Sequence, residues 1–340
     1  MTRRHKWQDL SDSELLKTKL ADLGLKITDS SLVAKCRDRL YSELEARNLK
    51  FKPHLWVSDD WFSPDGIPGF AVPFFLLHPR LIELTRAELA EAEGGSEDWC
   101  MRIMRHETGH AIDNAFGLRS LKQRQKLFGL TSTPYPESYS PKPFSRKYVV
   151  NLNSCYAQAH PDEDWSETFA VWLNPKSKWR IRYPRGLVRE KLDYVQHVMS
   201  ELKGKRSPNR GGETHDRLED SPKTLAKYFQ DIRKTYGFDS PHFFDRELKT
   251  VFCKNEEYKS KIRADRFLRG ERIDLRNRVS KLTGRYQYEV NDVISELIQR
   301  ASKLNLHLRV SERKTRVNLV AMLSKRPAAY LASEEYKIYL

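Results

Sequence analysis

The sequence has few cysteines, and none of them forms a closely spaced pair. Its 340 residues contain four, at Cys36, Cys100, Cys155 and Cys253. This spacing provides neither the disulfide framework of a small secreted domain nor the CxxC pairs of a zinc ribbon. We therefore expect reduced thiols in a cytoplasmic protein.

Long hydrophobic runs are also absent. The longest nearly uncharged apolar run, residues 66–78, contains two prolines and is shorter than the roughly 20 residues of a membrane helix. The first 16 residues, MTRRHKWQDLSDSELL, have no apolar stretch after their basic residues. These features predict neither a membrane partner nor an ordinary secretory signal.

Basic residues outnumber acidic residues, and the excess positive charge is unevenly distributed along the chain. The formal net charge is +15, and residues 201–340 contribute +11 of it, with 31 Lys and Arg against 20 Asp and Glu. Such a basic region suits an acidic partner or nucleic acid. No nucleic-acid-binding signature accompanies it, so the sequence favours a solvated basic surface.

The length predicts about two domains. Residues 204–222 are rich in Gly, Pro and charged residues, which is typical of a linker. We therefore expect one domain over residues 1–203, a linker over 204–222, and a basic, mainly helical region over 223–340. Periodicity and turn residues predict the elements of the first domain. They are helices over 12–23, 28–48, 96–116, 161–173 and 187–202, and extended segments over 51–57 and 70–77.

Residues 106–110 read His-Glu-Thr-Gly-His, the HExxH pattern. On a helix, positions i and i+4 share a face, so His106 and His110 can reach one ion. Two imidazoles and a carboxylate leave zinc a fourth position for water. Glu107 is close enough to take a proton from that water, which the ion acidifies.

Chance alone would produce an HExxH in this chain with a probability of roughly 2%, so the surrounding helix must be considered. The side of the helix opposite the histidines is apolar or small, which predicts that it faces a core. The residues on that side are Met104, Thr108, Ala111, Ile112 and Ala115. A polar face backed by a core face favours a metal site over a surface helix.

The third ligand determines the class of zinc site. A metzincin would continue with glycine and histidine where this chain has Asp113 and Phe116, so that pattern fails. Glu167, on the helix expected over 161–173, gives the gluzincin arrangement. Asp113 and His160 are rival third ligands. Three carboxylates are more naturally interpreted as groups that orient a ligating imidazole. They are Asp113, Glu163 and Asp164.

Two longer strings carry a resemblance to a known family. They are RHETGHAIDNA at 105–115 and YAQAHPDEDWSETFAVWL at 156–173, preceded by WFSPDGIPG at 61–69 and GGSEDWCMRI at 94–103. Over residues 28–200 the chain resembles the bacterial zinc-binding metallopeptidases that carry HExxH and YAQxHPxEDxxETFAVWL motifs. The resemblance implies a zinc hydrolase in which His106, His110 and Glu167 bind Zn²⁺ and Glu107 is the base.

The expected fold is therefore α+β and mostly helical: a zincin-like metallopeptidase domain with a small sheet, plus a helical C-terminal extension. The expected function is a zinc-dependent peptidase acting on a peptide or protein of unknown identity. The alternative is a non-enzymatic zincin-fold protein whose basic C-terminal region binds an acidic partner or nucleic acid. Glu107 favours the enzyme, because a purely structural zinc site needs no general base.

Overall fold

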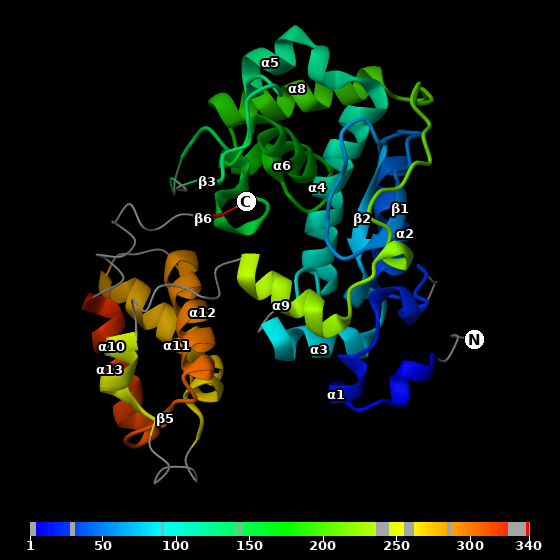
Figure 1. The fold of residues 1–340 in the computed structure, drawn as a ribbon. Coiled ribbons are helices and arrows are strands. Elements are labelled where there is room, and N and C mark those ends of the chain that lie inside the picture. Colours follow the sequence, from blue (N-terminus) through cyan, green and yellow to red (C-terminus); the bar gives the residue numbers. More distant parts are fainter. Residues whose placement is uncertain are drawn as a thin grey trace. The chain divides into compact units, whose positions relative to one another are not determined.

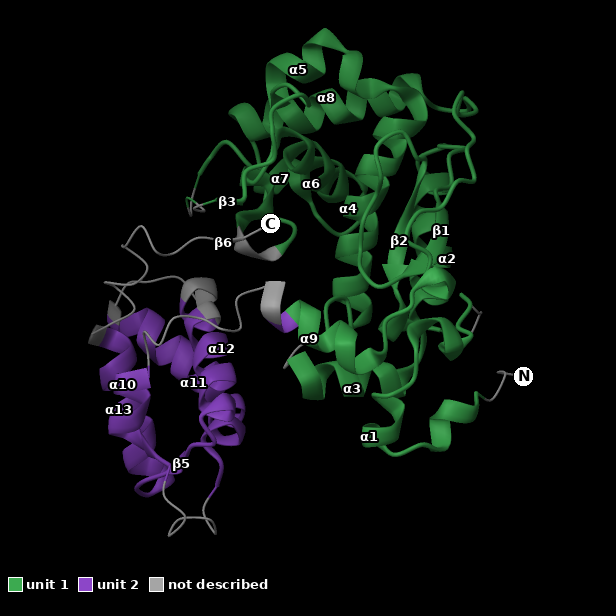
Figure 2. Cartoon of the chain, in the orientation of Figure 1, with its two compact units in different colours: residues 1–232, 339–340 green, residues 233–338 purple. Residues whose placement is uncertain are grey.

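The structure is a computed structural model of the chain. It describes residues 5–27, 31–89, 92–139, 142, 145–235, 245–254, 262–283, 287–325 and 338–339. The chain divides into two compact units (Figure 2), residues 1–232 with 339–340 and residues 233–338. Each unit has its own hydrophobic core.

Unit 1 is mostly helical, with a small sheet, which confirms the expected α+β, mostly helical class (Figure 1). Its α-helices are α1 (Asp12–Leu15), α2 (Leu32–Ala46), α3 (Pro79–Leu89), α4 (Glu97–Phe116), α5 (Lys122–Phe128), α6 (Pro161–Leu173), α7 (Trp179–Arg182), α8 (Leu187–Glu201) and α9 (Leu225–Thr235), the last of which reaches the unit boundary. Its 3-10 helices are η1 (Lys6–Asp9), η2 (Leu20–Leu23), η3 (Phe74–Leu77), η4 (Leu118–Ser120), η5 (Asn153–Gln158) and η6 (Leu218–Asp220). The two-residue strand β3 (Ser138–Tyr139) also belongs to unit 1, and β6 (Ile338–Tyr339) lies across the second unit boundary, after residue 338.

Two parallel strands, β1 (His54–Ser58) and β2 (Gly69–Pro73), form the small sheet. Every residue of β2 is buried. Its middle residue, Ala71, pairs with Trp56 on one side and forms a bridge with Phe62 on the other. The extended segment expected over 70–77 is shorter than predicted, because the chain turns into η3 after Pro73, whose ring removes the N–H that a continued strand would donate.

Helices α4 and α6 pack against each other, and α4 also contacts α2 and β2. The closest approach is at Gly109: a Cβ atom there would lie 2.7 Å from the Cα of Ser166. Trp165 strengthens the contact, since its indole Nε1 donates to the carbonyl of Gly109 at 2.8 Å. Because Gly109 has no side chain, α4 and α6, the two helices that carry the polar motifs, can approach this closely.

Replacing Gly109 with alanine is expected to destabilise unit 1, although Gly→Ala in a helix interior normally stabilises by up to about 1 kcal/mol. The added methyl group meets backbone, which cannot rotate away, so we expect a loss of about 1–3 kcal/mol in urea unfolding. Gly270→Ala is the control, because nothing lies within 4 Å of its Cβ position. A Gly109→Ala protein as stable as the parent would contradict the close contact.

The boundary between the units lies after residue 232, and not in the linker expected over 204–222. Backbone carbonyls of that segment accept hydrogen bonds from β1: Trp56 Nε1 donates to His215 at 2.7 Å, and Ser58 Oγ donates to Asp216 at 2.5 Å. Leu218 is buried in the core of unit 1. Gly and Pro correctly predicted a stretch without long helices, but composition cannot show whether its carbonyls are bound to the neighbouring strand.

In its described residues, unit 2 is a helical bundle with a short antiparallel strand pair. It contains α10 (Asp245–Val251), β4 (Phe252–Cys253), α11 (Ala264–Thr283), α12 (Gln287–Lys303), β5 (His307–Leu308) and α13 (Glu312–Lys325). Phe252 pairs with Leu308 and Cys253 with His307. α11 packs against α12 and α13. This agrees with the mainly helical C-terminal region that the sequence predicts.

The predicted helices around the motifs are confirmed within one or two residues at each end. α4 ends at Gly117, whose φ of 64° is left-handed, so the glycine stops the helix as expected. The helix expected over 12–23 is divided into α1 and η2, and residues 28–30 of the one expected over 28–48 lie outside the described residues.

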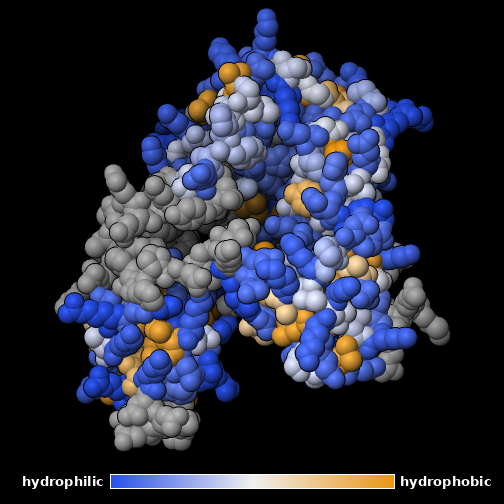
Figure 3. Space-filling model, in the orientation of Figure 1, coloured by the Kyte–Doolittle hydropathy of each residue, from blue (hydrophilic) through white to orange (hydrophobic). Residues whose placement is uncertain are grey.

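Among the described residues, every helix is too short or too polar to cross a membrane. On the face drawn in Figure 3, hydrophilic residues cover most of the described surface, and hydrophobic ones occur in small groups. The four cysteines carry no disulfide.

Candidate metal centre

Three donor atoms from α4 and α6 converge on one point. His106 Nε2 lies 3.2 Å from His110 Nε2, and Glu163 Oε2 lies 3.0 Å and 3.3 Å from these two nitrogens. Two ligands at tetrahedral positions around zinc, each about 2.0–2.1 Å from it, are about 3.3–3.4 Å apart. The spacing therefore fits a single ion bound by two imidazoles and a carboxylate, and this group is able to hold a metal.

The helix geometry of α4 explains how the two imidazoles meet. His106 and His110 are one turn apart on the same face, and their ring centroids are 4.9 Å apart. Both side chains are buried, as is Glu107 between them, which is 7% exposed. The helix is thus buried on its polar face as well as on its apolar one, because α6 covers the histidines.

Glu167 is placed differently from the ligand expected at that position. Its Oε1 accepts hydrogen bonds from His106 Nδ1 at 2.9 Å and from Asn151 Nδ2 at 2.8 Å. Its Oε2 accepts one from the backbone N–H of Leu152 at 2.8 Å. The carboxylate is fully buried and contacts the ring nitrogen of His106 that faces away from the three converging donors. Such a contact fixes the tautomer and the orientation of a ligating imidazole.

The geometry brings Glu163, and not the expected Glu167, into the group that could hold a metal. Glu163, expected to orient an imidazole, contributes its carboxylate oxygen to the donor group. Glu167, expected to be the ligand, orients His106. Both glutamates lie on the face of α6 that packs on α4, since they are one turn apart.

The rival ligand Asp113 lies away from the donor group, in a buried ion-pair network. The guanidinium of Arg124, which is fully buried, donates to Asp113 Oδ2 at 2.7 Å and to Asp162 Oδ1 at 2.9 Å. Thr131 Oγ1 donates to the same oxygen of Asp162 at 2.9 Å. This network joins α4, α5 and the start of α6, so Asp113 is paired with Arg124 and lies outside the donor group.

The other rival, His160, caps α6. Its Nδ1 accepts from the backbone N–H of Asp162 at 3.1 Å, and its Nε2 lies 2.7 Å from the carbonyl oxygen of Thr133. Asp164, the remaining candidate for orienting an imidazole, instead forms a buried ion pair with Lys191 at 2.5 Å. Neither residue contributes to the donor group.

Charge and burial act in opposite directions on the pKa values of the donors. Burial alone would lower the pKa of His106, but the hydrogen bonds that it donates to Glu163 and Glu167 raise it well above its ordinary value. Burial would raise the pKa of Glu163, but the charge of His110 and hydrogen bonds with both histidines hold it well below its usual range. The metal-free cluster therefore pairs an ionised Glu163 with a protonated His106, and a bound cation would have to replace that proton.

Burial also raises the pKa of Glu107, and the two histidines oppose this shift. A buried carboxylate with a raised pKa beside two histidines that could hold a metal is suited to accepting a proton and passing it on.

Two residues at this site were not identified from the sequence. The hydroxyl of Tyr135 donates to Glu163 Oε1 at 2.9 Å, and its ring stacks on His160 with centroids 3.7 Å apart. Asp60, in the loop after β1, is close enough to Glu107 for its charge to raise the pKa of that residue. Both lie in irregular segments, where no periodicity reveals which side chains turn inwards. The ring of Tyr156 also lies near that of His106, with centroids 5.5 Å apart.

Asp60 gives a pH dependence with a definite sign. Burial raises its pKa to about 6, above the ordinary value near 4, and the hydrogen bond from the backbone N–H of Trp61 offsets only part of the shift. The folded state therefore binds this proton more tightly, so Asp60 reduces stability as pH rises from about 4 through about 6. We expect Asp60→Asn to raise the melting temperature at pH 7.5 and to leave it nearly unchanged at pH 4. An equal effect at both pH values would contradict the shift.

Comparison with known proteins identifies the part of the chain that carries these residues. No curated protein and no solved structure was found to match. A family model does match, over residues 100–204, a range that includes both histidines and the three glutamates of the site. The motifs of the sequence had indicated this same family. Residues 100–204 match the family described as "Putative zinc-binding metallo-peptidase".

Proposed function

We propose that the protein is a zinc-dependent peptidase whose ion is held by His106 Nε2, His110 Nε2 and Glu163. The observation that carries this proposal is the mutual spacing of the three donors, 3.0–3.3 Å, which fits three corners of a zinc tetrahedron. Three protein ligands leave the fourth corner open, which is the arrangement of catalytic rather than structural zinc sites.

Zinc, when bound, supplies a Lewis acid that polarises the scissile carbonyl and makes water more acidic. Glu107 accepts a proton from the attacking water on its carboxylate and delivers it to the departing amine. Glu167 holds the Nδ1 proton of His106, which keeps Nε2 free to bind the ion. The hydroxyl of Tyr135 donates to Oε1 of Glu163, which holds the carboxylate so that Oε2 keeps its orientation toward the histidines.

Glu107 supports a peptidase over the non-enzymatic binding protein, because a site that only binds would not need a buried carboxylate beside its first ligand. We propose a peptide or protein as the substrate, with the cytoplasm as the location, since the four cysteines carry no disulfide. Nucleic acid stays the less favoured partner, as the basic surface lacks a recognised binding motif.

Digestion of a diverse peptide library by the zinc-loaded protein tests the function. We expect cleavage at defined positions, identified by mass spectrometry, that disappears when a chelator removes the metal and returns when zinc is added back. Cleavage that persists at full rate in the chelator would contradict a zinc peptidase. Stoichiometric zinc binding without cleavage of any library member would favour the binding protein.

A further inference from the structure

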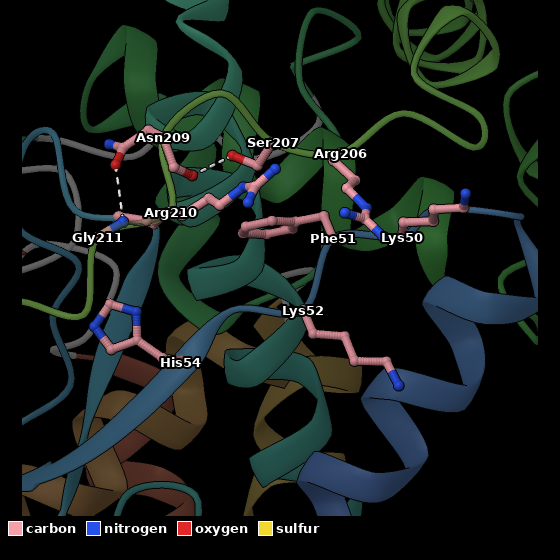
Figure 4. Close-up of a pocket in the computed structure, with 10 residues that line it drawn as sticks. Lys50, Phe51, Lys52, His54, Arg206, Ser207, Asn209, Arg210 and Gly211 are labelled. Carbon is pink, nitrogen blue, oxygen red and sulfur yellow. Dashed lines mark hydrogen bonds between the residues drawn. The ribbon is translucent and has the colours of Figure 1, made fainter.

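Unit 1 contains a concave site, away from the donor group of α4 and α6, that plays no part in the proposed peptidase chemistry. It is a surface pocket of about 500 Å³, formed where the segment entering β1 meets residues 206–211 (Figure 4). The volume is in the range of pockets that hold small molecules. Its lining residues are Lys50, Phe51, Lys52, His54, Pro68, Arg206, Ser207, Asn209, Arg210 and Gly211.

The lining is cationic. Two lysines and two arginines are among these ten described residues, and no aspartate or glutamate is. Lys52 forms an ion pair with Glu45 at 2.5 Å. Within the described part of the chain, Lys50, Arg206 and Arg210 form no ion pair. Three uncompensated cations around one concavity repel one another, and an anion would relieve that repulsion.

The two arginines are directed into the pocket. Figure 4 shows the side chain of Arg210 extending over the ring of Phe51, which is 5% exposed and forms the floor, and that of Arg206 ending between Phe51 and Lys50. Guanidinium groups present several N–H donors in a planar fork, a shape that matches the oxygens of phosphate. Two such forks above one apolar floor suit a ligand with more than one phosphate group.

The segment that carries the arginines is fixed to the rest of unit 1. Ser207 Oγ donates to the carbonyl of Ala115 at 2.9 Å, and Asn209 Nδ2 donates to the carbonyl of Gly66 at 2.6 Å. The side chain of Asn209 also accepts the N–H of Gly211 at 3.0 Å. A ligand therefore meets a backbone that is already ordered, which reduces the entropy cost of binding.

We propose that this pocket is a binding site for a small polyanion with two or more linked phosphate groups. Its volume exceeds what a single phosphate fills, and its concave form distinguishes it from the extended basic stripe that nucleic acid requires. The site is separate from the zinc ligands, so the proposal stands independently of the peptidase activity.

Isothermal titration calorimetry with inorganic tripolyphosphate tests the proposal, with EDTA present so that phosphate cannot bind through a metal ion. We expect one site per chain, and at least about 10-fold weaker binding by the double variant Arg206→Ala/Arg210→Ala, since it removes both guanidinium groups that would contact the phosphates. Both side chains are exposed enough to be replaced without loss of fold, which the melting temperature verifies.

The matched control is Arg146→Ala/Arg185→Ala, which removes the same charge from exposed positions outside the pocket. Its affinity for tripolyphosphate should change less than about 2-fold. Equal weakening by the two double variants would overturn the proposal, because it would indicate attraction to the overall charge. Absence of binding by the parent protein at low salt, or tighter binding of a single-stranded oligonucleotide than of tripolyphosphate, would also overturn it.

Discussion

Replacing Glu163 with glutamine is expected to weaken zinc binding by more than about 100-fold. A neutral amide is a poor zinc ligand, so the substitution removes one of three protein ligands and the negative charge that offsets the cation. Loss of a group that only orients a ligand typically costs about 10–100-fold, and a direct ligand should cost more. Competition with a chromophoric chelator measures the affinity.

Glu167→Gln is the matched comparison, since the two glutamates lie one turn apart on the same helix and both are buried. Its amide can still accept the hydrogen bond from His106 Nδ1, so we expect a loss of about 10–100-fold or less. The reverse ranking, with Glu167→Gln the more damaging variant, would assign the ligand role to Glu167. Circular dichroism of both variants verifies that the helices remain.

Replacing Glu107 with glutamine is expected to keep zinc and fold but to reduce hydrolysis by about 10²–10⁴-fold, the usual contribution of a general base. The amide is nearly the same size as the carboxylate and can still hydrogen-bond water, but it cannot accept a proton. The measurement is turnover of a substrate validated with the parent protein, alongside zinc content.

The control for Glu107→Gln is Glu97→Gln, an exposed position in the first turn of the same helix, outside the donor group. It should retain activity close to that of the parent. Full turnover by Glu107→Gln would contradict the mechanism, and lost zinc would show that Glu107 supports the site by its charge.

The sequence identified the helix pair and both histidines, because the HExxH spacing and helical periodicity are local properties. It also placed Glu163 and Glu167 on one face of α6. Which of them reaches Nε2 of His106 depends on how far α6 is displaced along α4, and a shift of one turn, about 5.4 Å, exchanges their roles. That displacement is set by the contact of Gly109 with Ser166, a long-range packing detail that no local pattern encodes.

Contacts between residues distant in sequence also determine how the segment over residues 204–222 is bound, and local composition does not encode them. Its composition predicts irregular backbone, and the structure agrees. Whether irregular backbone connects two units or binds along the edge of one is decided by partners distant in sequence. Here the partners are side chains of β1, about 160 residues earlier in the chain.

Zinc is proposed to bind between α4 and α6 on His106, His110 and Glu163. The most direct test is a crystal structure of the zinc-loaded protein with anomalous scattering data collected at the zinc edge. We predict one anomalous peak, bonded to Nε2 of His106, Nε2 of His110 and a carboxylate oxygen of Glu163, with Glu167 still on Nδ1 of His106. A peak bonded to Glu167 or Asp113, or no peak between the two helices, would contradict the claim.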